Sequence, residues 1–366
     1  MALKKDALHN LDFQEETIMA IQRYVVSNDR SVYESWPDLL LTEKGKLICV
    51  FCECTHHGDR SYSRIMYAES FDRGQTWQPK KPMTEAIRSE GIEHWDCPRM
   101  SHLKDGRLAV TCNRVVIRDG KPRGEIFLWF GDSEGEHWTE PFSTGFEGIV
   151  PDRLLETSSG RWIISCHTGR INGLDKLQQR LWYSDDQGKT WSEPVMIGSD
   201  PRYNLCEGYI LEVEPGTLVC FMRENSSEGY ECIVSKSLDD GLTWSPLYTI
   251  PLACCHRPTA GILDTGEIMI TYRYRQGAKK GWLGYWTQNT FLAVTDKETV
   301  LTGDKEKQWV RIMPLDYDTS PESDLGYTGW VQFDDGLIYV VDYIKNQEEK
   351  CYIIGDALTR ADIGGI

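Results

Sequence analysis

The sequence predicts an all-β protein folded as one six-bladed β-propeller that takes up residues 1–366. Two observations lead to this prediction. A hairpin phrase recurs six times along the chain, and an eight-residue turn motif follows it at a nearly constant distance. The 13 Trp and 17 Tyr exclude intrinsic disorder. A chain of 366 residues would ordinarily suggest two domains, but one large β architecture accounts for all of them.

Each copy of the hairpin phrase consists of a few apolar residues, a polar turn with glycine, and an apolar strand. In chain order the copies are LLLTEKGKLICVF from Leu39, SHLKDGRLAVTC from Ser101, LLETSSGRWIISC from Leu154, ILEVEPGTLVCF from Ile210, AGILDTGEIMITY from Ala260 and VQFDDGLIYVV from Val331. Glycine suits such a turn because it adopts positive φ without strain. The turn glycines, separated by 61, 54, 56, 50 and 70 residues, are Gly45, Gly106, Gly160, Gly216, Gly266 and Gly336. A period of about 50 to 60 residues is typical of a four-stranded propeller blade.

The turn motif Ser-x-Asp-x-Gly-x-Thr-Trp has three complete copies, which begin at Ser70, Ser184 and Ser237, and a degraded copy at 131–138. In all four the Asp lies 23 to 27 residues after the turn glycine of the preceding hairpin. The Asp carboxylate can accept backbone N–H bonds, and the Trp can bury a large ring between strands. We therefore interpret these motifs, known as Asp boxes, as structural hairpins between outer strands rather than as ligand sites.

With six hairpins and three complete Asp boxes, the sequence resembles the sialidase superfamily of six-bladed β-propellers. The resemblance covers roughly residues 30–345 and implies one blade for each hairpin. The segment 23–27 (RYVVS) is expected to pair with the last blade and close the ring. No linker in the sequence indicates a second domain.

Polar residues occupy the strand ends that should face the central channel of such a propeller. At the starts of the first strands we expect Trp36, Asp38, Asp96, Arg99, Asp152, Arg153, Glu207, Arg257 and Tyr327. At the ends of the second strands we expect Glu53, Arg114, His167, Arg223, Arg273 and Asp342. Burying these groups without partners is costly, so they form either ion pairs between blades or a polar pocket for a charged sugar. We favour the pocket.

The resemblance implies roles for two of these residues, because sialidases use a Tyr nucleophile activated by a Glu. Tyr327, in Leu-Gly-Tyr-Thr-Gly-Trp before the last hairpin turn, corresponds to the nucleophile. Glu207, in Cys-Glu-Gly-Tyr-Ile-Leu-Glu-Val, corresponds to the activating Glu, although Gly208 replaces the Pro of the family. The structural alternatives are a packed tyrosine and an ion pair between blades.

Sialidases also carry three arginines that hold the substrate carboxylate, and an aspartic acid/base. Arg223 matches the second arginine because it ends the hairpin that carries Glu207, and Arg273 or Arg257 would supply another guanidinium. Guanidinium groups bind planar carboxylates in a bidentate manner. Asp59, in the loop Thr-His-His-Gly-Asp-Arg, corresponds to the acid/base, with a solvated turn residue as the alternative. Substrate would partly desolvate this carboxyl and raise its pKa.

The sequence departs from the family at the first arginine. Ser35, in Glu-Ser-Trp-Pro, stands where the family has the Arg of Arg-Ile-Pro. Arg99 and Arg153 could compensate from other blades, or they indicate a different anionic sugar such as a uronate or a sulfated unit. The remaining residues of the predicted substrate-binding set are Arg114, Asp96 and Trp36.

Composition and motifs exclude several other classes of protein. The net charge of −16 argues against nucleic acid as a partner, and no apolar run is long enough for a transmembrane helix. The N-terminal residues lack the apolar stretch of a signal peptide, so we expect a cytoplasmic protein whose 12 cysteines are reduced. The sequence Cys52-x-Cys54-x-His56-His57 lacks the usual zinc spacing, and neither a metal nor an organic cofactor is expected. Three cysteines at equivalent repeat positions (97, 206 and 255) are interpreted as packing residues.

We therefore expect an exo-acting, retaining glycoside hydrolase whose partner is a glycan or a small acidic sugar. Tyr327 would attack, Glu207 would assist, and Asp59 would protonate the leaving oxygen. Two alternatives stay open. One is a lyase or isomerase that acts on a uronic acid, and the other is a non-catalytic carbohydrate-binding or scaffolding propeller. The sequence does not determine the oligomeric state.

Overall fold

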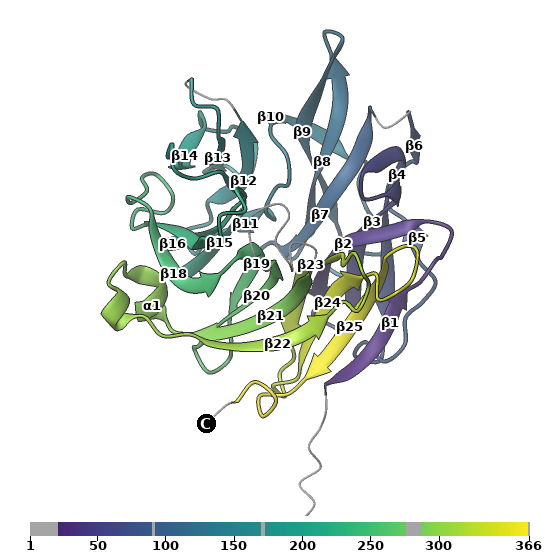
Figure 1. Ribbon diagram of the computed structural model, residues 1–366. Coiled ribbons are helices and arrows are strands. Elements are labelled where there is room, and N and C mark those ends of the chain that lie inside the picture. The colour runs from purple at the N-terminus through teal and green to yellow at the C-terminus, as the bar shows by residue number, and fades with distance from the viewer. Residues whose placement is uncertain (1–20, 90–91, 170–172, 276–286, 365–366) are drawn as a thin grey trace, which may run out of the picture.

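A computed structural model describes residues 21–89, 92–169, 173–275 and 287–364. These residues form six antiparallel sheets around a central axis, which confirms the prediction of a six-bladed β-propeller (Figure 1). The first strand of each blade lies near the middle of this view, and the fourth lies at the rim. Among the described residues, no helix is both long and apolar enough to cross a membrane.

The first three blades follow one another along the N-terminal half of the chain. Blade I contains β2 (Tyr33–Leu41), β3 (Leu47–His56), β4 (Asp59–Ser70) and β5 (Lys81–Pro82), and β6 (Ile87–Arg88) also pairs with β4. Blade II contains β7 (His94–His102), β8 (Leu108–Arg118), β9 (Lys121–Gly131) and β10 (Phe142–Glu147). Blade III contains β11 (Leu155–Glu156), β12 (Trp162–Gly169), β13 (Leu177–Ser184) and β14 (Val195–Gly198).

The other three blades complete the ring. Blade IV contains β15 (Leu205–Glu214), β16 (Thr217–Glu224), β17 (Glu231–Ser237) and β18 (Tyr248–Ala253). Blade V contains β19 (Cys255–Ile262), β20 (Ile268–Arg275), β21 (Gln288–Thr295) and β22 (Arg311–Tyr317), with α1 (Lys297–Leu301) and a short 3₁₀ turn (Lys305–Lys307) before β22. Blade VI contains β23 (Leu325–Gln332), β24 (Ile338–Ile344), β25 (Tyr352–Leu358) and β1 (Gln22–Ser27).

The N-terminal strand closes the ring as the sequence predicts. β1 pairs antiparallel with β25 of the last blade. Arg23 reinforces this pairing through ion pairs with Asp356 at 2.9 Å and Asp316 at 3.0 Å. Because the outermost strand of blade VI comes from the opposite end of the described chain, the propeller closes by strand pairing.

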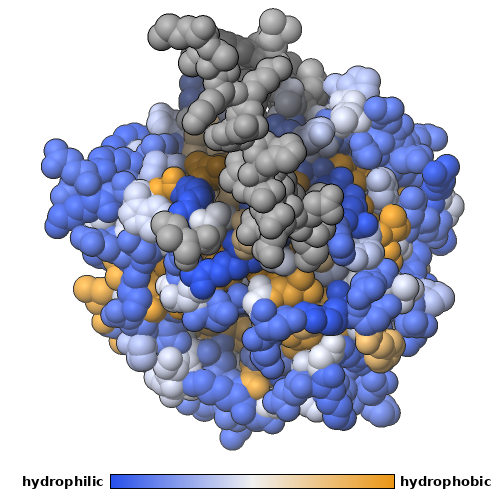
Figure 2. All heavy atoms as spheres, turned by 90° about the horizontal axis from the view of Figure 1, so that it is seen from below, coloured by the Kyte–Doolittle hydropathy of each residue, from blue (hydrophilic) through white to orange (hydrophobic). Residues whose placement is uncertain are grey.

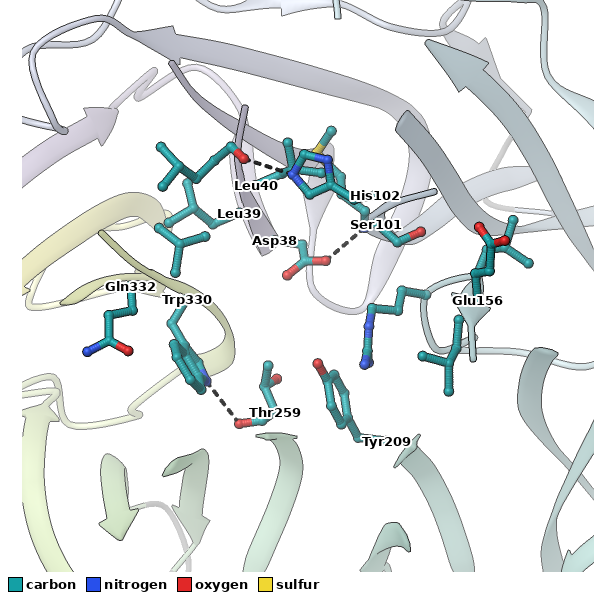
Figure 3. A pocket seen from close by; sticks show the side chains of 16 residues that line it. Asp38, Leu39, Leu40, Ser101, His102, Glu156, Tyr209, Thr259, Trp330 and Gln332 are labelled. Atoms are coloured by element: carbon teal, nitrogen blue, oxygen red, sulfur yellow. Dashed lines mark hydrogen bonds between the residues drawn. The ribbon is translucent and has the colours of Figure 1, made fainter. Parts of the chain in front are cut away.

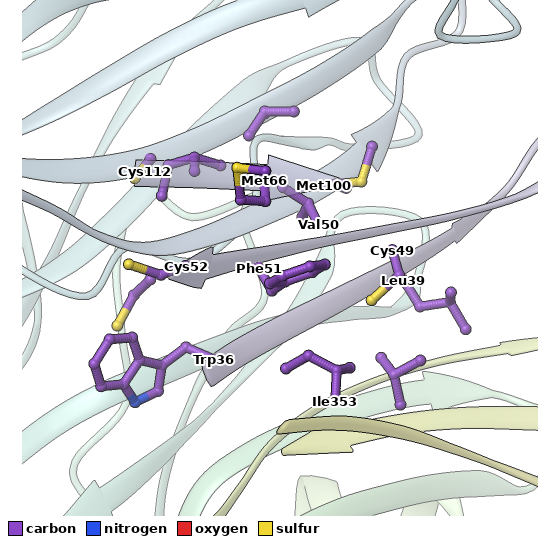
Figure 4. Close-up of a cluster of buried hydrophobic side chains, with 14 of the residues drawn as sticks. Trp36, Leu39, Cys49, Val50, Phe51, Cys52, Met66, Met100, Cys112 and Ile353 are labelled. Carbon is purple, nitrogen blue, oxygen red and sulfur yellow. The ribbon is translucent and has the colours of Figure 1, made fainter. Parts of the chain in front are cut away.

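The second strand of each blade is packed between neighbouring blades. In β3, eight consecutive residues are buried, which explains why its sequence LICVFCEC is nearly continuous in small and apolar side chains. Figure 4 shows part of the resulting core, where Phe51 and Cys52 from β3 lie near Met100 of blade II and Ile353 of blade VI. All twelve cysteines lie in the described residues, where they form no disulfide, and all but one are buried.

The Asp boxes are structural turns, as predicted. In the first box, Asp72 accepts hydrogen bonds from the backbone N–H and the hydroxyl of Thr76, at 2.9 and 2.5 Å. The Ser70 hydroxyl accepts the N–H of Gly74 at 2.9 Å, and the indole N–H of Trp77 donates to the Gly74 carbonyl. The second and third boxes repeat these bonds. Each complete box joins the third and fourth strands of its blade, away from the axis.

The outer surface is mostly hydrophilic, as the composition of the chain predicts. Figure 2 shows one side of the molecule, on which hydrophilic side chains dominate and the hydrophobic areas are small and separated. The exposed large apolar residues are scattered over different blades, for example Phe71, Leu238 and Tyr317. Isolated apolar residues of this kind are ordinary on a soluble surface.

Candidate active site

A β-bulge near the start of the first strand is shared by the blades. The strand register shifts at this point in five of them. In all six, a residue other than glycine takes a positive φ of 48–59°, and these residues are Trp36, Cys97, Val150, Glu207, Arg257 and Tyr327. Such a conformation costs about 1–2 kcal/mol for each residue, and a bulge re-aims a side chain. The six residues with positive φ therefore define one mouth of the channel, which we call the bulge mouth.

Two of these side chains form the centre of the site. The Tyr327 hydroxyl donates a hydrogen bond to Oε1 of Glu207 at 2.5 Å, although the two residues lie on blades VI and IV. The same oxygen accepts a hydrogen bond from Nη1 of Arg223 at 2.7 Å. Burial alone would raise the pKa of Glu207, but the charges of Arg223 and Arg273 and these hydrogen bonds lower it to about 2. Glu207 is therefore ionised and positioned to receive the proton of Tyr327.

The phenol is held in its neutral form. Burial, and then the Glu207 charge, raise the pKa of Tyr327 well above its usual range, while Arg223 and Arg273 oppose them. The guanidinium carbons of Arg273 and Arg257 lie 5.2 and 5.7 Å from the centre of the Tyr327 ring. Because the hydroxyl keeps its proton at neutral pH, it can act as a nucleophile only if a base takes that proton as a bond forms.

Three buried guanidinium groups surround this pair. Arg223, Arg257 and Arg273 are each less than a tenth exposed. Several of their buried nitrogens have no hydrogen-bond partner among the described residues: Nε of all three, and also Nη1 of Arg257. Burial and the nearby Arg99 lower the pKa of Arg257, whereas Asp152 and Glu207 oppose this effect. Three cations beside one paired carboxylate leave an excess of positive charge. The cluster can therefore bind an anion.

Trp36 and Asp96 also lie at the bulge mouth. The Trp36 ring packs against Tyr327 with centroids 6.5 Å apart, and the guanidinium of Arg60 lies over Trp36 at 4.3 Å. Asp96 lies 3.8 Å from Arg60 and accepts a hydrogen bond from the thiol of its neighbour Cys97. The predicted set of Tyr327, Glu207, Arg223, Arg257, Arg273, Trp36 and Asp96 is thus brought together by the fold.

Arg99 fills the channel beneath this group instead of lining the pocket. It is 2% exposed, forms an ion pair with Asp38 at 3.2 Å and donates to the carbonyl of Thr328. These contacts link blades I, II and VI. For Arg99 the structure supports the ion-pair alternative that the sequence left open.

Arg153 faces a different pocket at the other end of the channel. This pocket, of about 430 Å³, is lined by later residues of the first strands, including Asp38, His102, Tyr209 and Trp330 (Figure 3). The Arg153 guanidinium stacks on Tyr209 at 4.2 Å and donates to the carbonyl of Ile210. The prediction that Arg153 shares a pocket with Tyr327 is wrong, because Tyr209 and the carbonyl of Ile210 on blade IV hold its guanidinium at this other pocket.

Arg114 and Asp59 do not join the cluster either. Arg114 lies on the second strand of blade II, where it stacks on Trp95 and Phe127 at 5.1 and 5.8 Å. The Asp59 side chain is exposed, and its Oδ1 accepts the backbone N–H of Ser61 at 2.8 Å. That hydrogen bond lowers the pKa of Asp59, whereas the predicted acid/base role requires a raised pKa. The structure supports the alternative of a solvated turn residue.

Other groups at this mouth were not assigned a role from the sequence. Nδ1 of His167 accepts the backbone N–H of Glu207 at 3.2 Å, and burial lowers the pKa of this imidazole to about 4. Asn225 accepts a hydrogen bond from Arg223 at 2.5 Å. Nδ1 of His57 forms a hydrogen bond with Oδ2 of Asp324, next to blade VI, at 2.7 Å. No local motif marks Asn225 or Asp324, because each meets its partner only through the tertiary fold.

No metal centre is evident in the parts of the chain that the structure describes. Nowhere among them do three or more His, Cys, Asp or Glu side chains gather in an arrangement that could hold a metal ion. Cys52 and Cys54 are buried on β3, and the thiol of each donates to a nearby backbone carbonyl.

The six blades and their Asp boxes define the class of protein by its fold, a β-propeller built from Asp-box repeats with the architecture of sialidases. Residues 130–340 match the BNR repeat-like domain family. Because this match covers more than half of the chain, the chain belongs to that family.

Solved structures with similar folds include sialidases. A protein of unknown function from Dyadobacter fermentans DSM 18053 aligns with a TM-score of 0.74 and 18% identity, over 93% of this chain and 100% of that one. The Hadza microbial sialidase Hz136 aligns at 0.68 and 18% identity, over 93% and 69%. A leech intramolecular trans-sialidase, complexed with 2,7-anhydro-Neu5Ac, aligns at 0.65 and 13% identity, over 92% and 69%. At these identities the likeness shows the fold alone.

One curated protein matches locally. Envelope glycoprotein L of varicella-zoster virus (strain Oka vaccine) is 30% identical over 119 residues, which cover 27% of this chain and 71% of that protein. Since this match leaves most of the propeller unaligned, it gives no functional assignment for the site.

Proposed function

We propose that the chain is an exo-acting glycoside hydrolase that releases a terminal anionic sugar, sialic acid or a related acid sugar, from a glycan. Tyr327 is the nucleophile, Glu207 accepts its proton, and Arg223, Arg257 and Arg273 bind the negative group. The observation that supports this proposal most is the 2.5 Å hydrogen bond between Tyr327 and Glu207 within a cluster that holds more guanidinium than carboxylate charge.

A tyrosine nucleophile suits a substrate whose anomeric carbon bears a carboxylate. A carboxylate nucleophile would be repelled by that group, whereas a neutral phenol can approach it. Glu207 takes the phenolic proton as the bond from Tyr327 to the anomeric carbon forms. A covalent glycosyl-tyrosine intermediate and its hydrolysis by water then give a product of retained configuration.

The guanidinium groups supply the complementary charge. Arg223, Arg257 and Arg273 would bind a carboxylate of the substrate through guanidinium N–H groups, and several of their buried nitrogens lack a partner among the described residues. The protein as a whole carries a charge of −16 and repels polyanions at long range, so attraction must come from this local cluster. A small, singly charged terminal sugar is therefore a better substrate than a polyanionic chain.

Substrate binding should also activate Glu207. In the resting site, Arg223 and Arg273 hold the pKa of Glu207 near 2, which makes the carboxylate a weak base. The negative charge of a substrate carboxylate bound among these guanidiniums partly cancels the positive electrostatic potential that they create at Glu207. The pKa of Glu207 then rises toward its ordinary value, and the base becomes stronger when Tyr327 must lose its proton.

A uronic acid is the second candidate substrate, and one observation favours it. Ser35 is completely buried, and its hydroxyl has no hydrogen-bond partner among the described residues. No guanidinium therefore comes from the position where sialidases carry their first arginine, and the carboxylate of the substrate need not lie at the anomeric carbon. A lyase or isomerase acting on a uronate would give an unsaturated or isomerised product instead of the free sugar.

The test is release of methylumbelliferone from its α-sialoside and its β-glucuronide by the wild type, Tyr327→Phe and Tyr24→Phe. Tyr24 lies on the rim strand β1, so its variant is the matched control. We expect turnover of one substrate by the wild type and the control, and a loss of about 100-fold or more in Tyr327→Phe. Full activity in Tyr327→Phe, or a wild type inert on both substrates, would refute the proposal.

A further inference from the structure

The proposed reaction needs a second group, which protonates the departing oxygen and later activates water. Asp59 is exposed and its carboxylate is engaged with the backbone of its own turn. The same turn between β3 and β4 carries His57, whose imidazole contacts both an aspartate and an aromatic residue of the bulge mouth.

We propose that His57 is the general acid/base of this site and that Asp324 is its positioning residue. This inference rests on the proposed function, since it assigns the remaining catalytic group of that reaction. It replaces the loop aspartate suggested by the family resemblance with an imidazole held from another blade.

The contacts of Asp324 fix the orientation of the imidazole. Its Oδ2 lies 2.7 Å from Nδ1 of His57 and accepts the hydroxyl of Tyr33, and its Oδ1 accepts the hydroxyl of Tyr343 at 2.9 Å. Burial would raise the pKa of Asp324, but His57, the Tyr33 hydroxyl and the charge of Arg273 lower it to about 2, so the carboxylate stays ionised. Nδ1 then carries a proton that it donates to Asp324, and Nε2 is left for proton transfer.

His57 lies next to the nucleophile across a single aromatic ring. Its imidazole packs against Trp36 in an edge-on arrangement, with centroids 5.5 Å apart. Tyr327 packs against the same indole, with ring centroids 6.5 Å apart. His57 and Tyr327 thus share Trp36 as a neighbour, which places the acid/base and the nucleophile on the same side of the channel, where one bound sugar can reach both. The His57 side chain is 44% exposed, which leaves it open to a substrate.

Arg60 holds the turn in place. Its Nη1 donates to the backbone carbonyls of His56, at 2.7 Å, and of His57. Its guanidinium stacks on Trp36 at 4.3 Å. The contacts from Arg60 below and from Asp324 beside it give His57 the fixed geometry that catalysis demands.

The proton transfers balance over two steps. In the first step, doubly protonated His57 gives its Nε2 proton to the glycosidic oxygen as the bond from that oxygen to the sugar breaks. The bond from Tyr327 to the anomeric carbon forms, and Glu207 takes the phenolic proton. In the second step, neutral His57 takes a proton from water, the water oxygen bonds to the sugar, and Tyr327 leaves and regains its proton from Glu207.

Substrates with different leaving groups test this role. Methylumbelliferone departs with little help from an acid, whereas a sugar alcohol must be protonated. For His57→Gln we expect kcat/KM to fall by about 10²–10⁴-fold on a glycoside with a sugar leaving group, but by less than about tenfold on the methylumbelliferyl glycoside. His102→Gln, at the opposite mouth of the channel, is the matched control, for which we expect wild-type kinetics on both substrates.

Asp324→Asn should reproduce the dependence on the leaving group, which a loss of folding would not produce. Added imidazole should restore part of the lost activity in His57→Ala and none in Asp324→Asn. Equal losses on both substrates in His57→Gln would overturn the inference, as would the same dependence on the leaving group in Asp59→Asn or Asp96→Asn. A wild type that cleaves neither substrate would instead refute the proposed function, and the role of His57 with it.

Discussion

Replacing Arg257 with methionine should stabilise the folded protein while it removes substrate binding. Arg257 is fully buried, and its hydrogen bond, from Nη2 to the carbonyl of Pro151, is 3.2 Å long. Nε and Nη1 lack partners among the described residues. Methionine has a similar length and no donor groups, so it fills the space without leaving buried polar atoms unsatisfied.

The size of the effect follows from these contacts. Each buried N–H group without a partner costs about 1–3 kcal/mol, and the lost bond to Pro151 is worth about 1 kcal/mol. The two unpaired groups together therefore give a net gain of about 1–5 kcal/mol for Arg257→Met. With an unfolding entropy of about 2 cal/mol/K for each residue, this gain raises Tm by about 1–6 °C in a chain of this length.

Arg223→Met is the matched comparison, because Arg223 is also a buried arginine of the cluster but is paired. Its removal leaves the carboxylate of Glu207 without its ion pair, and we expect a loss of about 3 kcal/mol. Urea unfolding followed by tryptophan fluorescence measures both variants, and release of methylumbelliferone measures their activity. Both should lose at least about 100-fold in kcat/KM.

The reasoning would be refuted if Arg257→Met destabilised the protein by more than about 1 kcal/mol, since removing an unpaired buried charge should not do so. It would also be refuted if that variant kept wild-type kcat/KM. Added substrate analogue should raise the Tm of the wild type but not of Arg257→Met, because a ligand stabilises only the state that binds it.

Three further predictions concern single side chains. Burial raises the pKa of Asp342 to about 8 from an ordinary value of 3.8, so the free energy of unfolding should fall as pH rises from about 4 to 8. Asp342→Asn should remove that dependence in urea unfolding at pH 5, 7 and 9, and the same pH dependence in both proteins would contradict this prediction. Glu207 has a pKa lowered to about 2, so its contribution to stability is present above about pH 4.5 and is lost toward pH 2. In Glu207→Gln the stability should depend less on acid pH, and kcat should fall by about 10²–10⁴-fold. An unchanged kcat would contradict the role of Glu207. Ser70→Ala removes three hydrogen bonds of the first Asp box and should cost about 1–3 kcal/mol in urea unfolding with kcat/KM unchanged. A loss of activity at full stability would contradict the structural role of the box.

The fold could be predicted from the sequence because its signals are local and repeated. Each hairpin turn needs a glycine at positive φ, and Gly45 and the five equivalent glycines have φ of 75–92°. Each complete Asp box satisfies its own backbone within eight residues, as Asp72 does with Thr76. Such local requirements are visible in one sequence without knowledge of distant contacts.

Part of the site could also be predicted. Tyr327 and Glu207 occupy equivalent positions of the hairpin repeat, and so do the arginines that end the second strands of blades IV and V. A repeat places equivalent residues at equivalent distances from the axis. Position in the repeat was therefore enough to predict that Tyr327, Glu207, Arg223 and Arg273 lie close together.

The remaining residues could not be assigned because two non-local features decide their place. In blade II a bulge separates Asp96, at the bulge mouth, from Arg99 beneath it, and the sequence shows no sign of the bulges beyond a proline after four of the six residues with positive φ. The pairing of His57 with Asp324 joins residues 267 positions apart, from the first and last blades. Asp59 lies in the loop after the first hairpin, where the family has its acid/base, but its carboxylate accepts the backbone N–H of Ser61 in its own turn.

The most direct test of the central claim is a search for a covalent intermediate on Tyr327. The wild type would be mixed with an activated acid-sugar substrate, quenched in acid during turnover, digested and analysed by mass spectrometry. The account predicts a glycosyl adduct on the peptide that contains Tyr327, lost in Tyr327→Phe together with turnover. Turnover that persists in Tyr327→Phe, or an adduct located on another residue, would contradict it.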